Sequence, residues 1–147
     1  IDQYQTQIPA AVADFVGLGR APQLIINWQG EDETRTASTS PTSKYAENLT
    51  RQFRKCWGYW PGAAILDVKL LMNTNDYTGV GASPNWPQVT AAKAQVAAAF
   101  PGRLFTMDPR SPSVLPLSDA VHQVASPLGA GVAAQRMVAA IRSFYNI

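Results

Sequence analysis

The sequence predicts an α/β fold built on a parallel β-sheet. Segments with helical periodicity alternate along the chain with short apolar runs of strand length. The strand-like runs are almost continuously apolar, which is typical of parallel strands that are buried on both faces. We therefore predict a three-layer α/β/α architecture in a single domain over residues 1–147, in the order α-β-α-β-α-β-loop-α.

The first predicted elements are a helix over residues 3–18 and a strand over residues 24–28. Apolar residues recur at helical spacing from Ile8 to Val16, and Gly19 then favours an end to the helix. The strand is a short, β-branched run that stops at a polar turn. A Ser/Thr-rich stretch that follows this turn is expected to form a surface loop.

The middle of the chain predicts a second helix and a second strand. Ser43 or Thr42 is a candidate N-cap for this helix, and Gly58 with Pro61-Gly62 should end it. Its predicted buried face carries four large side chains at helical spacing, namely Tyr45, Leu49, Phe53 and Trp57. The next strand is expected over residues 63–72, where Asp67 interrupts an otherwise apolar run.

The last third predicts an Ala-rich helix over residues 86–100 and a short strand over residues 104–107. Three prolines between Asp108 and Ser118 exclude regular structure, so this stretch is predicted to be a loop. A final helix is expected from Ser126 or Pro127 to about Tyr145.

Three strands make a small sheet for a doubly wound domain. The first predicted strand is also preceded by a helix, as though one or two βα units were missing upstream. An unpaired inner strand would expose backbone groups and apolar side chains. We therefore expect N-terminal strands from residues before Ile1, or from a second polypeptide, to complete the fold.

Composition excludes several classes of function. The chain has 12 basic and 10 acidic residues without a run of like charge, so neither a nucleic-acid groove nor a basic membrane-binding patch is predicted. No stretch approaches the about 18 apolar residues of a membrane span. The single cysteine, Cys56, excludes an internal disulfide, and one histidine with one cysteine provides too few ligands for a typical zinc site.

The turn Gln29-Gly30-Glu31 follows the first predicted strand directly. In parallel sheets, functional residues collect at the carboxyl ends of the strands. A glycine between polar residues allows a tight turn with exposed backbone N–H groups, which suits an oxyanion site. The alternative is an ordinary solvated turn.

A second candidate site is formed by Asp119 and His122 in the loop after the third predicted strand. His122 is the only histidine in the chain, so any histidine general base must be this residue. The carboxylate of Asp119, three residues earlier, could orient the imidazole toward a nucleophile. The alternative is a surface histidine with an unrelated aspartate nearby.

Taken in order, these motifs resemble the SGNH hydrolase superfamily, in the branch of sialate-O-acetylesterase-like carbohydrate esterases. The stretch from Trp28 to Asp32 is similar to the W-x-Q-G-E-s-D segment of that branch. Residues 92–95 loosely resemble its R-E-A-Q helix, and Asp119 to His122 resemble its terminal D-x-x-H block. The resemblance extends over nearly the whole chain and implies a flavodoxin-like SGNH fold.

The resemblance implies a serine esterase that hydrolyses O-acetyl esters on sugars without a metal or an organic cofactor. His122 would be the general base, Asp119 would orient it, and Gln29 and Gly30 would line the oxyanion hole or substrate pocket with support from Glu31. The family's Gly-Asp-Ser-like nucleophile segment is absent from this chain. We therefore expect the chain to be the C-terminal part of an SGNH-like domain.

Two further hypotheses remain open at this stage. A degenerate esterase fold would serve as a non-catalytic glycan-binding or structural module, for example in a virion. An unrelated flavodoxin-like domain would carry the same motifs by chance. The resemblance favours an extracellular or virion-associated location over a cytoplasmic one.

Overall fold

The computed structural model describes residues 3–30, 44–69, 85–108 and 130–147, and it confirms the α/β class. In chain order, the elements are α1 (Gln3–Gly17), β1 (Leu24–Asn27), α2 (Tyr45–Tyr59), β2 (Ala64–Val68), α3 (Trp86–Ala99), β3 (Leu104–Met107) and α4 (Val132–Tyr145).

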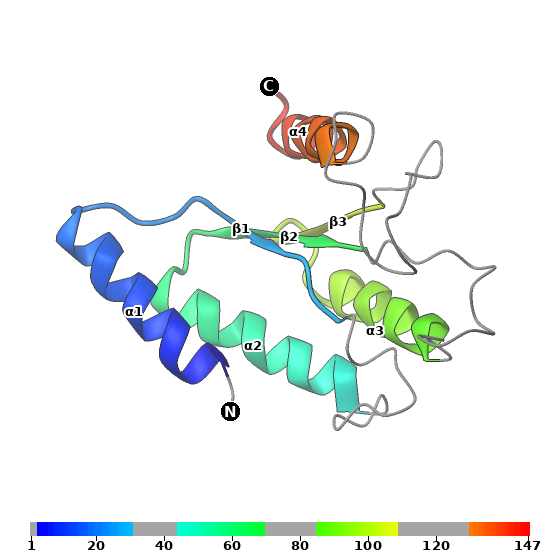
Figure 1. Ribbon diagram of the computed structural model, residues 1–147, viewed down its shortest axis with the longest axis horizontal. Coiled ribbons are helices and arrows are strands. Elements are labelled where there is room, and N and C mark those ends of the chain that lie inside the picture. The colour runs from blue at the N-terminus through cyan, green and yellow to red at the C-terminus, as the bar shows by residue number, and fades with distance from the viewer. Residues whose placement is uncertain (1–2, 31–43, 70–84, 109–129) are drawn as a thin grey trace.

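The strands of this described part form a three-stranded parallel sheet in the order β1-β2-β3. Asn27 of β1 is in register with Asp67 of β2, which in turn is in register with Thr106 of β3. Helix α4 covers one face of the sheet, whereas α1, α2 and α3 lie on the other (Figure 1). All five residues of the central strand β2 are buried, as expected for a strand covered on both faces.

The larger core lies between the sheet and helix α2. Five residues of α2 are buried at helical spacing, and they are Tyr45, Leu49, Phe53, Cys56 and Trp57. They pack with Ile65 of β2, Val89 of α3 and Leu104 of β3. Trp57 also donates a hydrogen bond from Nε1 to the carbonyl oxygen of Ala63 at 3.0 Å, which satisfies its buried polar group.

A smaller core joins the opposite face of the sheet to helix α4. Leu66 and Val68 of β2 are fully buried there, and Met137 and Ile141 of α4 pack against their cluster. The rings of Phe105 and Phe144 stack with their centroids 4.0 Å apart. These contacts hold α4 over β2 and β3.

Several boundaries differ from the sequence predictions. Strand β1 ends at Asn27 rather than at the predicted Trp28. Helix α2 ends at Tyr59, between the predicted terminators Gly58 and Pro61-Gly62. Lys44 occupies the N-cap position of α2 without a side-chain hydrogen bond, while Thr42 and Ser43 lie outside the described residues. The predicted starts of the last helix at Ser126 or Pro127 also lie outside them.

Candidate functional site

The Gln29-Gly30 turn lies directly after the carboxyl end of β1. Gly30 has a φ of 112°, a backbone conformation that side chains with a Cβ atom rarely adopt. A Cβ atom on Gly30 would lie 2.5 Å from the hydroxyl oxygen of Tyr45 and 3.1 Å from Cγ1 of Val89. The Tyr45 hydroxyl also donates a hydrogen bond to the carbonyl oxygen of Gln29 at 3.3 Å. Backbone conformation and close packing therefore both require glycine at position 30.

A buried polar network lies beneath this turn. Asn27 donates a hydrogen bond from Nδ2 to Oδ1 of Asp67 at 2.7 Å, and Lys93 Nζ lies 2.7 Å from the same oxygen. Lys93 also donates to the carbonyl oxygen of Val68 at 3.2 Å. Gln52 of α2 donates to Oδ1 of Asn27 at 3.2 Å. The network thus ties β1 to β2, α2 and α3 at the carboxyl end of the sheet.

The charges of this network are fully removed from solvent. Asp67 is 0% exposed and Lys93 is 1% exposed. Burial raises the pKa of the Asp67 carboxyl above its ordinary value, and the Lys93 ammonium and the Asn27 amide oppose this rise. Oδ2 of Asp67 has no hydrogen-bond partner within the part of the chain that the structure describes. The ion pair therefore carries a desolvation cost that only one of the two carboxylate oxygens offsets.

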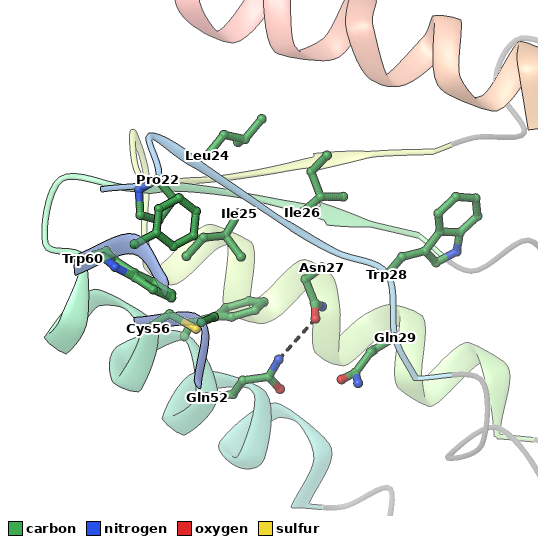
Figure 2. A pocket seen from close by; sticks show the side chains of 13 residues that line it. Pro22, Leu24, Ile25, Ile26, Asn27, Trp28, Gln29, Gln52, Cys56 and Trp60 are labelled. Carbon is green, nitrogen blue, oxygen red and sulfur yellow. Dashed lines mark hydrogen bonds between the residues drawn. The ribbon is translucent and has the colours of Figure 1, made fainter. Parts of the chain in front are cut away.

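A groove of about 580 Å³ runs along the outer edge of β1, and we call it the edge groove (Figure 2). It is lined by Ala11, Phe15, Pro22, Leu24, Ile25, Ile26, Asn27, Trp28, Gln29, Gln52, Phe53, Cys56 and Trp60. None of these residues is charged. At one end lie the side-chain amides of Gln29 and Gln52, beside Asn27, whose two amide atoms are engaged in the buried network. The remainder of the lining is largely apolar.

The structure places two of the predicted site residues, Gln29 and Gly30, directly after the carboxyl end of β1, and Gln29 also lines the edge groove. Glu31, Asp119 and His122 lie outside the described residues. The predicted juxtaposition of the Gln29 turn with the Asp119–His122 loop therefore stays a prediction.

The buried polar network has only a weak signal in the sequence. Asp67 stood out only as a charge inside an apolar strand, which is the pattern expected when a carboxylate is buried with a partner. Lys93 lies in an Ala-rich helix and looks like an ordinary surface lysine in the sequence. Its partner is 26 residues away, so the pairing follows from the tertiary fold alone.

Neither a metal cluster nor a membrane-spanning helix is found within the described ranges. No group of three or more His, Cys, Asp or Glu side chains gathers there in a way that would bind a metal ion. None of the described helices combines the length and apolar character that crossing a bilayer requires.

Comparison with known proteins shows the fold. No family model matches the sequence, and no curated protein matches it. Among solved structures, the chain is similar to the X-ray structure of a protein from Arabidopsis thaliana, with a TM-score of 0.69 and 16% sequence identity. The similarity covers 99% of this chain but only 52% of the Arabidopsis chain, so this chain spans about half the length of that protein.

Proposed function

We propose that this chain is the C-terminal part of a serine carbohydrate esterase of the SGNH type, which hydrolyses O-acetyl esters on sugars. The nucleophilic serine lies upstream of these residues or in a partner chain. The observation that carries the proposal is the Gln29-Gly30 turn. It lies at the carboxyl end of a parallel strand, and glycine is required at the position where the resembling family has its Q-G-E segment.

In this proposal, the serine hydroxyl attacks the acetyl carbonyl carbon while His122 takes the hydroxyl proton, with Asp119 orienting the imidazole. The sugar oxygen leaves with that proton, and water then hydrolyses the acyl-serine to release acetate. Gln29 and the Gly30 backbone stabilise the developing oxyanion, and Glu31 supports the turn. The mechanism requires neither a metal nor an organic cofactor.

The uncharged lining around the turn agrees with a neutral substrate. Asn27, Gln29 and Gln52 lie at the carboxyl end of β1 on the α2 side of the sheet, whereas the ring of Trp28 points to the α4 side (Figure 2). Amides that both donate and accept hydrogen bonds suit sugar hydroxyl groups. The hydrogen bonds from Gln52 to Asn27 and from Asn27 to Asp67 fix the orientation of two of these side chains.

The test uses the polypeptide translated from the complete reading frame, together with any chain that co-purifies with it. The material is treated with a fluorophosphonate probe, and every polypeptide is analysed by intact mass. We expect label on a serine outside residues 1–147 and release of acetate from an acetylated sugar. Folded protein that takes up no label and releases no acetate would contradict the proposal.

That negative result would favour the second candidate, a non-catalytic module of esterase fold with a glycan-binding or structural role. The observation that favours this candidate is that the described residues supply an uncharged groove with amide and tryptophan side chains. Binding of an acetylated glycan without hydrolysis, measured by calorimetry on the same material, would support it.

A further inference from the structure

Tyr45 is the residue of the α2 core face whose identity packing alone does not explain. The buried residues of this face are Tyr45, Leu49, Phe53, Cys56 and Trp57. Tyr45 is 7% exposed, and a phenylalanine ring would fill the same space without adding a polar group to the core. A buried hydroxyl group costs free energy unless it makes a hydrogen bond. The place that this hydroxyl reaches therefore indicates what the tyrosine does.

The hydroxyl of Tyr45 lies against the turn that follows β1. It donates a hydrogen bond to the carbonyl oxygen of Gln29 at 3.3 Å. It also occupies the space that a side chain at Gly30 would need, since a Cβ atom there would lie 2.5 Å from the hydroxyl oxygen. Tyr45 thus lies next to both residues that form the peptide bond between Gln29 and Gly30.

The orientation of this peptide determines where the N–H of Gly30 points. A trans peptide is planar, and its C=O and N–H groups point in opposite directions. Because the carbonyl of Gln29 points toward Tyr45, the N–H of Gly30 points away from Tyr45 and from α2. Gly30 is buried, so a negative charge that develops beside this N–H is shielded from water, which strengthens a hydrogen bond to it.

Neighbouring elements hold the turn and the tyrosine in place. Val89 of α3 lies on the same side of Gly30 as the tyrosine, because its Cγ1 atom would be 3.1 Å from a Cβ atom there. Just before the turn, the side chain of Asn27 is anchored to Asp67 in β2. The ring of Tyr45 packs in the larger core between α2, α3 and the sheet. A rigid part of the fold therefore presents the hydroxyl, as accurate positioning of a reactive group requires.

We propose that Tyr45 is a positioning residue of the oxyanion site. Its hydroxyl holds the Gln29–Gly30 peptide so that the N–H of Gly30 points toward the acyl oxygen of the bound ester. The inference rests on the proposed function and deepens it, because it names the group that orients one of the oxyanion donors. Tyr45 itself touches neither the ester nor the serine. At 3.3 Å its hydrogen bond is long for an O–H···O pair, so it orients the peptide more than it polarises the N–H.

Tyr45→Phe tests this role, because it removes the hydroxyl and keeps the ring in the core. The variant is made in the polypeptide translated from the complete reading frame, and acetate release from glucose pentaacetate is measured. We expect kcat to fall about 10-fold while KM stays within about twofold, because the donor is misaligned in the transition state and the contacts to the sugar remain. The loss should be smaller than the about 100- to 1,000-fold that follows complete removal of an oxyanion donor.

The matched control is Tyr59→Phe, the same substitution in the same helix at a side chain that is 44% exposed. It should leave kcat and KM unchanged. Thermal unfolding establishes that both variants are folded at the assay temperature.

Nuclear magnetic resonance observes the same peptide independently of activity. The residual dipolar coupling of the Gly30 N–H reports the direction of this bond in the folded protein. In Tyr45→Phe it should change, whereas the couplings of the β1 amides from Leu24 to Asn27 should stay the same. Tyr59→Phe should change neither set of couplings.

Four results would overturn the role of Tyr45. They are an unchanged kcat in Tyr45→Phe, an equal loss in Tyr59→Phe, a rise in KM at constant kcat, and an unchanged dipolar coupling of Gly30. The unmodified polypeptide separates this inference from the esterase proposal. If it releases no acetate, both are overturned, whereas acetate release that Tyr45→Phe leaves unchanged overturns the role of Tyr45 alone.

Discussion

Gly30 connects the end of β1 to the following residues through a conformation that only glycine adopts without strain. The sequence placed a glycine between two polar residues after an apolar run, and this was enough to predict a tight turn there. The sequence could not predict the close approach of the Tyr45 hydroxyl and the Val89 side chain, because both come from other elements. The requirement for glycine is therefore stronger than the turn alone would impose.

Substitution of Gly30 tests this requirement. We expect Gly30→Ala to reduce the free energy of unfolding by about 1–3 kcal/mol for backbone strain alone, with further loss from overpacking against Tyr45. Urea denaturation provides the measurement. The matched control is Gly58→Ala in α2, where a Cβ atom meets nothing within 4 Å and stability should stay the same or rise slightly. Equal losses in both variants would contradict the assigned role of Gly30.

His122 is the residue on which the proposed chemistry depends most. In the complete polypeptide, His122→Ala should reduce the rate of acetate release by about 1,000-fold or more, because the serine loses its general base. Circular dichroism should show an unchanged fold. An unchanged rate in the folded variant would exclude His122 as the base.

The pairing of Asp67 with Lys93 could not be predicted from the sequence. Both ionic side chains are buried, and their pairing depends on the packing of α3 against the carboxyl end of β2. Removing one partner leaves the other charge buried without compensation, which is costly.

Lys93→Met should therefore reduce the free energy of unfolding by about 3–5 kcal/mol at neutral pH. Adding Asp67→Asn should restore most of the loss, because no isolated charge then remains. The matched control is Lys44→Met, which removes a lysine at an exposed position and should change stability by less than about 0.5 kcal/mol. A double variant as unstable as Lys93→Met alone would contradict this account.

The pH dependence of Lys93→Met follows from the pKa of Asp67. Burial raises that pKa in the folded chain, and loss of Lys93 removes the main opposing effect, so the folded pKa rises further. A carboxyl whose folded pKa exceeds its unfolded value contributes stability below the unfolded pKa, and this is lost as pH rises through the folded pKa. The loss of unfolding free energy that Lys93→Met causes relative to the unmodified chain should therefore become smaller as pH falls from neutral toward about 4. A loss of unfolding free energy that stays the same at every pH, measured by urea denaturation, would contradict this expectation.

Helix α2 is the element whose core residues were predicted best from the sequence. The four predicted core residues Tyr45, Leu49, Phe53 and Trp57 are all buried, because their spacing places them on one face of a long helix. The start of the helix was less predictable, since capping depends on local geometry rather than on a repeating pattern. Strand β2 likewise ends at Val68, earlier than its apolar run suggested.

Because one face of α2 is buried in the core, substitutions on that face should destabilise the chain more than substitutions on its exposed face. Phe53 is 1% exposed, so Phe53→Ala should cost about 3–5 kcal/mol of unfolding free energy through lost burial and a cavity. Tyr59→Ala in the same helix, at a side chain that is 44% exposed, should cost less than about 1 kcal/mol. Thermal or urea unfolding measures both, and similar losses would contradict the assigned orientation of the helix.

For the whole molecule, the sequence predicted an α/β fold with a parallel sheet and a deficit of strands. The alternation of segments was sufficient for the class because helices and strands have different hydrophobic periods. The described sheet has three strands, and its terminal strand β1 has the composition of an inner one. The sequence could not reveal the strand order β1-β2-β3 of the described sheet, because strand order depends on pairing between segments that are distant along the chain.

Because no described strand pairs with the outer edge of the apolar strand β1, we expect the 147-residue chain to be prone to self-association. Ile26→Lys places a charge on β1 at a side chain that is already 51% exposed, where it hinders edge-to-edge pairing at little cost to the fold. We expect analytical ultracentrifugation to show less association for this variant than for the unmodified chain. Val16→Lys is the matched control, because it adds the same charge at a side chain of α1 that is 73% exposed. If Val16→Lys suppresses association as strongly, net charge rather than the β1 edge governs solubility, since charge alone then accounts for the effect.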